Sequence, residues 1–403
     1  MRLLLLALPV AFAAGLASDS GREGPASLDR GLPREGADWR PYHRERDHPL
    51  NLVARRILLV ETVPAKVGAD LPREPLTSDP LPADWMLRWR DGAPPDRRLF
   101  GGDGRQLPRE GFDEDESRAL RNELAAITDE DASELKTDAI LAVLFQHDLL
   151  RMAVRLVDSE RNPELISLLM EASQRVALPR ELLVALEPLS YGDALAPREG
   201  EWKEVLRRST RLFDASRTLL WSRAYLSHPD GAESLLRSIE SSGDDVEVPV
   251  GMRALLEQGI VAIDSDGEPC ATSLVVDVRA QVLANRDPRG ADNATTSRDG
   301  VDFSILHLER ESVRRRDDAG VRVFRDVDDE DQDLFRDYGT LKHTTYRAQC
   351  ALCHRITRHP EPQLGGFPIL RPSARPRFAE TGAERMRLAE DQVREKLVEL
   401  RRD

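Results

Sequence analysis

Cysteine is scarce in this chain, which has only Cys270, Cys350 and Cys353 among its 403 residues. Three thiols are too few for a framework of several disulfides, and an odd number leaves one thiol unpaired in any scheme with a single disulfide. Aromatic residues are also few, at 5%, but hydrophobic residues make up 40% of the chain. That hydrophobic content is sufficient to build cores, and the length allows two or three domains.

The sequence also lacks a concentrated basic face, a long internal apolar run and the common hydrolase motifs. The net charge is −14, and arginine is interleaved with aspartate and glutamate almost everywhere, which argues against nucleic acid as a partner. We find no glycine-rich phosphate loop, no His-Glu-x-x-His helix and no nucleophile elbow. An electron-transfer or binding protein is therefore favoured over an enzyme.

The first seventeen residues, "MRLLLLALPVAFAAGLA", form the one markedly apolar stretch. Arg2 precedes an apolar run from Leu3 to Phe12, and small residues follow up to Ala17. This order is typical of a cleavable signal peptide, and the run is shorter than the roughly 20 residues that a membrane anchor needs. We predict a signal peptide over 1–17, a secreted or periplasmic protein, and no transmembrane segment in the mature chain.

Near the other end, "AQCALCHRIT" places Cys350 and Cys353 three apart, with His354 directly after the second cysteine. In an exported protein C-x-x-C-H is the attachment sequence for c-type haem. The two thiols can bond the vinyl groups at one edge of the macrocycle while the histidine lies under the iron. On these three residues the chain resembles the c-type cytochromes. The resemblance implies one covalently bound haem c, held by Cys350 and Cys353, with His354 as the proximal iron ligand.

Other interpretations of the motif stay open. A thioredoxin-like dithiol would need a surrounding βαβ unit, which the flanking sequence does not show. A zinc site would need a fourth ligand, for which His343 and His359 are the nearest candidates. A plain disulfide is the remaining alternative. In the last two cases the protein would be a non-enzymatic envelope interaction protein, with its cysteine pair closed as a disulfide or holding a metal.

The second axial ligand of the haem is not evident from the sequence. In small c-type cytochromes a methionine from a downstream loop fills this position, but Met386 is the only methionine after the motif. Met386 falls on an apolar helical stripe, which predicts a core residue. Met386 and His343 are the candidates for the distal ligand that the sequence offers. We therefore expect either two histidine ligands or five-coordinate iron. Basic residues around the motif could meet an acidic redox partner protein or a haem propionate.

The rest of the chain predicts an α+β fold. The pattern indicates a helical domain, then a small antiparallel β domain of about four strands, then a short, mostly helical C-terminal segment that binds haem. Cys270 lies at the predicted Asp266-Gly267 turn and is expected to be a buried, unreactive thiol. Oligomeric state is not indicated. The predicted boundaries are a signal peptide over 1–17, a loop-rich arm over 18–115, a helical domain over 116–235, a β domain over 245–330 and a cytochrome c-like segment over 338–403.

These features together predict an extracytoplasmic c-type haem protein. Its iron would transfer one electron, and its upstream domains would select the redox partner.

Overall fold

The computed structural model describes residues 39–60, 99–100, 112, 114–158, 162–192, 195–197, 200–206, 215–241, 249–283, 301–326, 332–335, 342–345, 377–378 and 382–401. The predicted signal peptide and the C-x-x-C-H motif lie outside these residues. All described residues belong to one compact unit, Gly31–Asp403.

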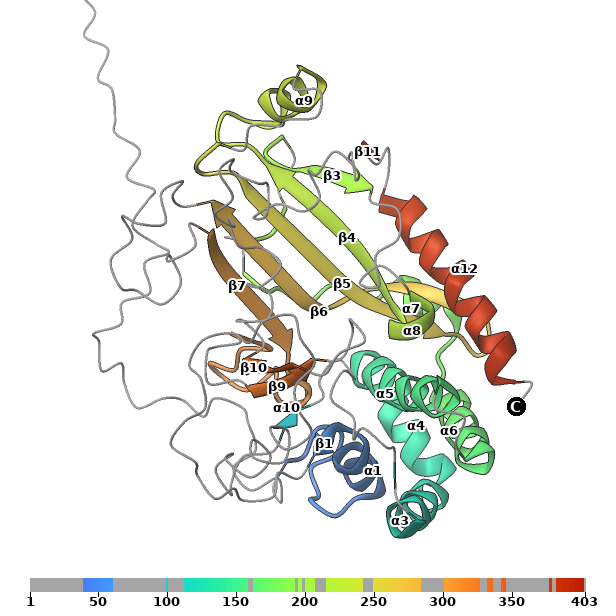
Figure 1. Ribbon diagram of the computed structural model, residues 1–403. Helices are drawn as coiled ribbons and strands as arrows, with labels where there is room; N and C mark the ends of the chain where they lie inside the picture. The colour runs from blue at the N-terminus through green and yellow to red at the C-terminus, as the bar shows by residue number, and fades with distance from the viewer. Residues whose placement is uncertain are drawn as a thin grey trace, which may run out of the picture. The chain divides into compact units, whose positions relative to one another are not determined.

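Within the described residues the largest element is a seven-stranded antiparallel sheet in the order β11-β3-β4-β5-β6-β7-β8 (Figure 1). Its strands are β3 (Lys203–Leu206), β4 (Leu220–Ser227), β5 (Arg253–Ile263), β6 (Pro269–Leu283), β7 (Val301–Leu308), β8 (Phe324–Asp326) and β11 (Arg377–Phe378). Two short antiparallel pairs lie outside this sheet. They join β1 (Leu59–Val60) to β2 (Leu99–Phe100), and β9 (Gln332–Phe335) to β10 (Lys342–Thr345).

The antiparallel strands predicted between residues 245 and 330 are present as β5, β6, β7 and β8. The predicted turn between the first two is also confirmed. Gly267 has a φ of +83°, which an L side chain rarely adopts. The Asp264 carboxylate accepts hydrogen bonds from the backbone N–H groups of Asp266 and Glu268, which fixes the turn.

The prediction of a helical domain over 116–235 is wrong for part of that range, which contains the strands β3 and β4. In β4 all eight residues except Arg223 are buried. A central strand covered on both faces has no alternation of apolar and polar residues, so its sequence does not show the period of two that identifies a strand.

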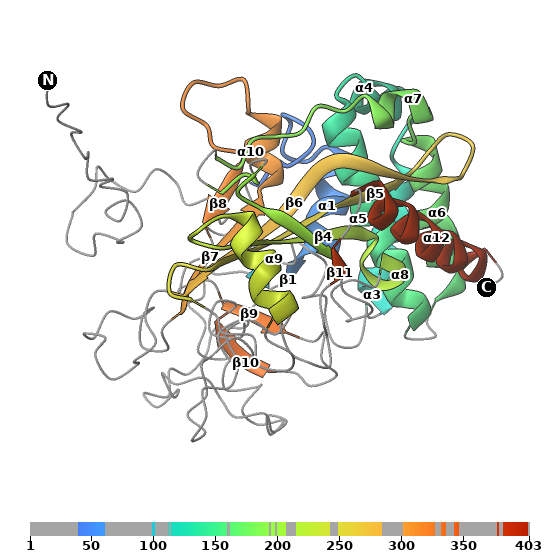
Figure 2. The ribbon, with the colours of Figure 1, turned by 90° about the horizontal axis from the view of Figure 1, so that it is seen from above.

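Helices gather at one end of the sheet, where α5 packs against α6 and against β5 (Figures 1 and 2). The helices before the sheet are α1 (Pro49–Leu58), α3 (Glu114–Ala125), α4 (Asp129–Lys136), α5 (Ala139–Asp158), α6 (Pro163–Arg175) and α7 (Arg180–Val184). The starts of two of them follow from the residues at their first turns. Asn162 caps α6 through a bond from the Leu165 N–H, Pro163 is its first residue, and Pro179 precedes α7.

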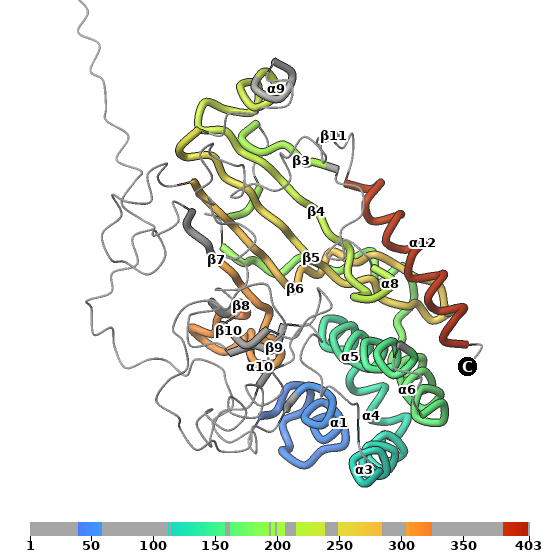
Figure 3. The backbone as a smooth tube through the Cα atoms, in the orientation of Figure 1, coloured from blue at the N-terminus to red at the C-terminus, as the bar shows by residue number. Residues whose placement is uncertain are grey.

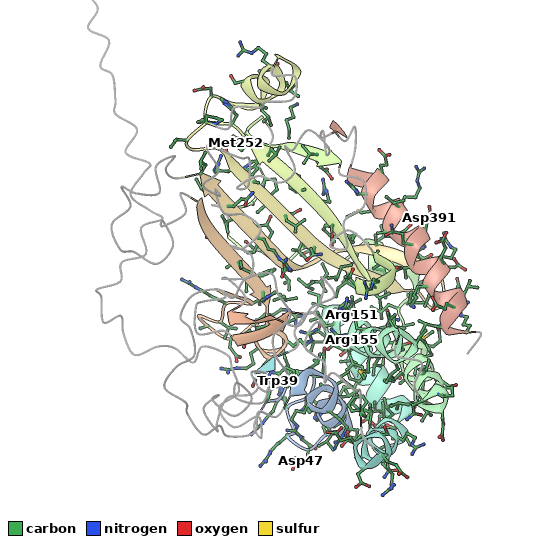
Figure 4. The ribbon with its side chains drawn as sticks, viewed as in Figure 1. Trp39, Asp47, Arg151, Arg155, Met252 and Asp391 are labelled. Atoms are coloured by element: carbon green, nitrogen blue, oxygen red, sulfur yellow. The ribbon has the colours of Figure 1, made fainter. Side chains whose placement is uncertain are left out.

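Helix α1 corrects the prediction of a loop-rich arm over 18–115. Five of its apolar residues recur at spacings of three and four and are buried: Leu50, Val53, Ala54, Ile57 and Leu58. The Arg- and Pro-rich flanks hid this short stripe, which is shorter than the window in which helical periodicity is clear. Trp39 and Tyr42 are both buried beside it, and Figure 4 labels Trp39 there.

The remaining helices connect or cover the strands. They are α8 (Ala215–Thr218), α9 (Ala232–Ser241), α10 (Arg310–Arg314) and α12 (Gly382–Leu400). The predicted apolar stripe of α12 is confirmed by the burial of Ala389, Val393, Leu397 and Leu400. Figure 3 follows α12 along the sheet, where it contacts α8, β4 and β6.

Helices and strands share one hydrophobic core. Leu149 of α5, Ile260 of β5, Leu274 of β6 and Val393 of α12 are all fully buried in it. The fold class is therefore α+β, as predicted, but the ranges 116–235 and 245–330 do not have separate cores. No helix in the described part of the chain is long and apolar enough to cross a lipid bilayer.

Candidate functional site

The predicted haem site falls mainly outside the described residues. Cys350, Cys353 and His354 are there, as is His359. His343 is in β10, paired with Leu334 of β9, and only its backbone is described. Met386 lies on α12, partly buried and packed against the core, which agrees with its predicted place on the apolar stripe.

A row of polar side chains crosses four neighbouring strands of the sheet. Cross-strand pairing places Ser222 of β4 opposite Gln258 of β5, Gln258 opposite Asp277 of β6, and Asp277 opposite His307 of β7. Directly paired residues share a face of the sheet, so all four side chains lie on one face. Arg279, two positions after Asp277, joins them on that face. We call these five residues the polar row.

The polar row is connected by hydrogen bonds along its length. The Gln258 Nε2 donates to the Ser222 hydroxyl at 3.1 Å, and an Arg279 Nη2 donates to the Gln258 Oε1 at 3.3 Å. The Asp277 carboxylate then uses both oxygens. Oδ1 accepts from the Arg279 Nε at 2.7 Å, and Oδ2 lies 2.9 Å from the His307 Nδ1.

Burial changes along the polar row. The Asp277 side chain is 1% exposed, whereas the His307 side chain is 20% exposed. A buried carboxylate needs charged or hydrogen-bonding partners, which Arg279 and His307 provide. The row therefore ends in an imidazole whose orientation is set by a buried carboxylate, an arrangement found in general bases and in metal-binding histidines.

A second polar cluster occupies the opposite face of the sheet around Glu257. Its carboxylate accepts hydrogen bonds from the hydroxyls of Tyr225, at 3.0 Å, and Tyr191. Burial, followed by the nearby Glu257 charge, raises the pKa of both phenols. Arg223, on the same face, pairs with Glu204 at 2.7 Å. Both tyrosines therefore stay protonated, and the cluster holds a loop and the three strands β3, β4 and β5 together.

A third cluster is enclosed between α5, α10 and the segment before α1. The Asp148 carboxylate accepts from the Tyr42 hydroxyl and from the Arg310 guanidinium. Burial is the largest single effect and opposes ionisation of Asp148, but the Arg310 charge together with the interactions of His147 and Arg310 outweighs it and keeps the carboxyl pKa below its ordinary value. The adjacent His147 is buried, and its Nε2 lies 3.3 Å from the Thr218 carbonyl oxygen. This cluster is closed to solvent and joins elements far apart in the sequence.

His147 lies within α5. Its ring is fully within the core, and burial lowers its pKa. Figure 4 shows two arginines of the same helix, Arg151 and Arg155.

Cys270 is a free, buried cysteine, as predicted. Burial also raises the pKa of its thiol, which favours the unreactive protonated form.

Sequence analysis missed Asp277 and His307 as candidate site residues. Each carries a charged or titratable side chain inside an apolar strand, in "LVVDVRA" and "FSILHLE". That placement is a detectable signal of a buried polar group. Their contact depends on the register between β6 and β7, which the separate strand sequences do not encode visibly.

Comparisons of the chain with family models, with curated proteins and with solved structures found no match.

Proposed function

We propose that this protein is an extracytoplasmic c-type haem protein that transfers one electron. The observation that carries the proposal is the C-x-x-C-H motif of Cys350, Cys353 and His354, together with residues 1–17, whose pattern predicts a signal peptide. Cys270 supports it indirectly. That thiol is buried and free, so neither motif cysteine forms a disulfide with it.

Each motif residue has a distinct role in the proposal. Cys350 and Cys353 hold the macrocycle through thioether bonds, which prevents loss of the cofactor in a dilute compartment. His354 provides the proximal nitrogen ligand. When bound, the haem supplies a reversible one-electron change at its iron, and the protein sets the reduction potential through the axial ligands, hydrogen bonds and burial.

The rest of the chain would present the haem to its partner. A seven-stranded sheet and its helices share one core, and such a rigid scaffold can position a tethered cofactor and a recognition surface. A redox partner protein would bind near the haem, where basic residues flank the motif in the sequence: Lys342, Arg347, Arg355 and Arg358. An acidic protein fits this charge.

The test is production in a host with the c-type cytochrome maturation machinery. We expect a red protein with a Soret band, whose pigment stays with the polypeptide in acid acetone and whose mass includes one haem. Replacement of Cys350 or Cys353 with Ala should prevent full covalent attachment, and His354→Ala should remove the proximal ligand. Cys270→Ser is the matched control and should keep its haem, because this buried thiol lies outside the motif.

A colourless wild-type protein, or a pigment that acid acetone extracts, would contradict covalent haem attachment. Quantification of free thiols and bound zinc in that product would then separate the disulfide from the metal site.

A further inference from the structure

Two histidines stack on each other where the segment before α1 meets α4. The ring centroids of His43 and His48 lie 3.7 Å apart, and the two ring planes are inclined by 28°. Their side chains are only 19% and 11% exposed. Imidazoles change charge near neutral pH. A change of protonation here would therefore act directly on a partly buried contact between two parts of the chain.

Both imidazoles accept a backbone hydrogen bond through Nδ1. The His43 Nδ1 accepts from the Glu45 N–H at 3.1 Å, and the His48 Nδ1 accepts from the Leu50 N–H at 3.3 Å. The second bond satisfies a backbone donor in the first turn of α1, which begins at Pro49. A ring nitrogen that accepts carries no proton, so the neutral ring holds its proton on Nε2. Each ring therefore makes these bonds only while it is neutral.

The Nε2 atoms of the two rings face carboxylates of α4. The His48 Nε2 lies 3.1 Å from the Asp131 Oδ1, and the His43 Nε2 lies 3.7 Å from the Glu134 Oε1. The Asp131 side chain is 18% exposed, whereas the Glu134 side chain is 65% exposed. Water screens such an exposed and distant charge, so Glu134 can offset only a small part of the cost of a positive charge on His43.

His43 accordingly resists protonation while the segment is closed. Burial, followed by the neighbouring His48 ring, lowers the pKa of His43 from its ordinary value of 6.5. The carboxylates of Glu134, Glu45 and Asp131 oppose this shift and are outweighed. An open segment, in which His43 has its ordinary pKa, therefore binds the proton more readily. The closed contact is fully favoured above pH 6.5 and loses stability as the pH falls below it.

The loop between the two histidines can move without uncovering the core. The buried Asn51 side chain holds its beginning, since it accepts from the Tyr42 and His43 N–H groups and donates to the His43 and Glu45 carbonyls. The four residues 44–47 are exposed, and Figure 4 labels Asp47 among them. Tyr42 itself is buried. Release of the stack would therefore open the loop and leave the buried residues before it in place.

The same hydrogen bonds argue against a metal site at this pair. A metal bound at Nε2 would require the proton on Nδ1, where each ring faces a backbone N–H. Over the residues that the structure describes, no group of three or more ligating side chains is placed to hold a metal ion. The ligand to which this pair responds is therefore the proton.

We propose that His43 and His48 form a pH-sensitive latch, which closes the loop 43–48 on α4 near neutral pH and releases it in mildly acidic solution. Protonation of His43 replaces its accepting lone pair with an N–H that faces the Glu45 N–H. It also places a positive charge against the His48 ring. The loop then leaves the stack while the core stays folded. The latch needs no haem, so it stands independently of the proposed function.

The test is amide hydrogen exchange of the full chain across pH 5 to 8 (roughly the range in which histidines titrate), with rates corrected for the intrinsic pH dependence of exchange. Protection of the Glu45 and Leu50 amides should fall with acidification, by up to about tenfold per pH unit for one proton. The Ile263 amide, which is bonded to buried Gln146, should stay protected. That difference separates opening of the loop from unfolding. Nitrogen NMR at the alkaline end should place the proton on Nε2 in both rings.

His43→Asn isolates the titrating group, because asparagine offers an oxygen near the position of Nδ1 and does not take up a proton. Protection of the Glu45 amide should then stay constant across the pH range. His228→Asn is the matched control. The His228 Nδ1 accepts the Asp230 N–H at 3.1 Å in the same local arrangement, and its replacement should leave the acid response of the loop unchanged.

The wild-type measurements alone can overturn the latch. Equal protection of the Glu45 amide at both ends of the pH range would do so, as would a proton on Nδ1 of either ring at the alkaline end. Loss of protection at Ile263 in step with Glu45 would assign the response to unfolding and would also overturn it. An acid response that persists in His43→Asn would exclude His43 as the titrating group.

Discussion

At the residue scale, the buried carboxylates Asp148 and Asp277 are each held by at least one partner that is distant in the sequence. Asp148 of α5 is held by Tyr42 and Arg310, and Asp277 of β6 is held by Arg279 and His307. A buried charge without such partners would cost several kcal/mol. The charged contacts therefore specify how the elements fit together, in addition to any role in chemistry.

His147 leads to a prediction about pH. Its imidazole is buried near Asp148, Arg151 and Arg310, and burial lowers its pKa from the ordinary value of 6.5. Below pH 6.5 the unfolded chain therefore binds a proton that the folded protein does not. The free energy of unfolding should fall as the pH drops below 6.5, by up to about 1.4 kcal/mol per pH unit from this group.

The measurement is the difference in unfolding free energy between wild type and His147→Gln across pH 5 to 8 (roughly the range in which histidines titrate). Glutamine can still donate to the Thr218 carbonyl, so the variant should lose only the pH-dependent part. His228→Gln serves as a comparison at a second, partly buried histidine, whose Nδ1 accepts the Asp230 N–H. An identical pH dependence in wild type and His147→Gln would refute the prediction.

At the element scale, β4 and β5 approach closely where Trp221 is paired with Gly259. A Cβ at Gly259 would lie 2.1 Å from Trp221 Cζ2 and 2.8 Å from the Leu274 carbonyl oxygen. The indole cannot move easily, because its Nε1–H donates to the Thr272 carbonyl at 2.8 Å. The register irregularity between β5 and β6 falls at this same glycine.

Gly259→Ala should therefore destabilise the protein by about 3 kcal/mol, the upper part of the usual range for overpacking. Chemical denaturation provides the measurement. Gly382→Ala is the matched control, since its Cβ would meet the Arg223 guanidinium at 2.5 Å, the movable end of a long side chain. Its cost should be clearly smaller. Equal costs for the two variants would mean that Trp221 repacks without penalty.

At the scale of the whole molecule, helices and sheet are joined through buried Gln146 of α5. Its Nε2 donates to the Ile263 carbonyl at 2.7 Å, and its Oε1 accepts from the Ile263 N–H at 2.9 Å. This side chain thus completes the hydrogen bonding of a residue at the end of β5. One core and such bonds predict a single cooperative unfolding transition.

Far-UV circular dichroism and tryptophan fluorescence should accordingly give the same unfolding midpoint. Gln146→Ala should lower both midpoints together. The free energy of unfolding should fall by about 2 to 4 kcal/mol, because the variant leaves two buried backbone groups without a partner. Gln174→Ala is the control, since Gln174 makes a comparable but exposed bond to the Ser265 carbonyl. Two separate transitions in wild type, or an effect of Gln146→Ala on one probe alone, would contradict this account.

The sequence by itself determined the local features. An aspartate-glycine pair marked the turn between β5 and β6, and apolar spacing marked α12. These signals depend on backbone preferences and on periodicity within a few residues. The C-x-x-C-H motif is also local, so the haem proposal comes from the sequence alone.

Only the tertiary structure decided that β3 and β4 extend the sheet, that helices and strands share one core, and that Asp277 orients His307. β4 is buried on both faces, so packing and not pattern makes it a strand. The contact between Asp277 and His307 follows from strand register, and a shift by one residue would turn these side chains to opposite faces. Register is set by the core as a whole, which is why no single stretch of the sequence revealed it.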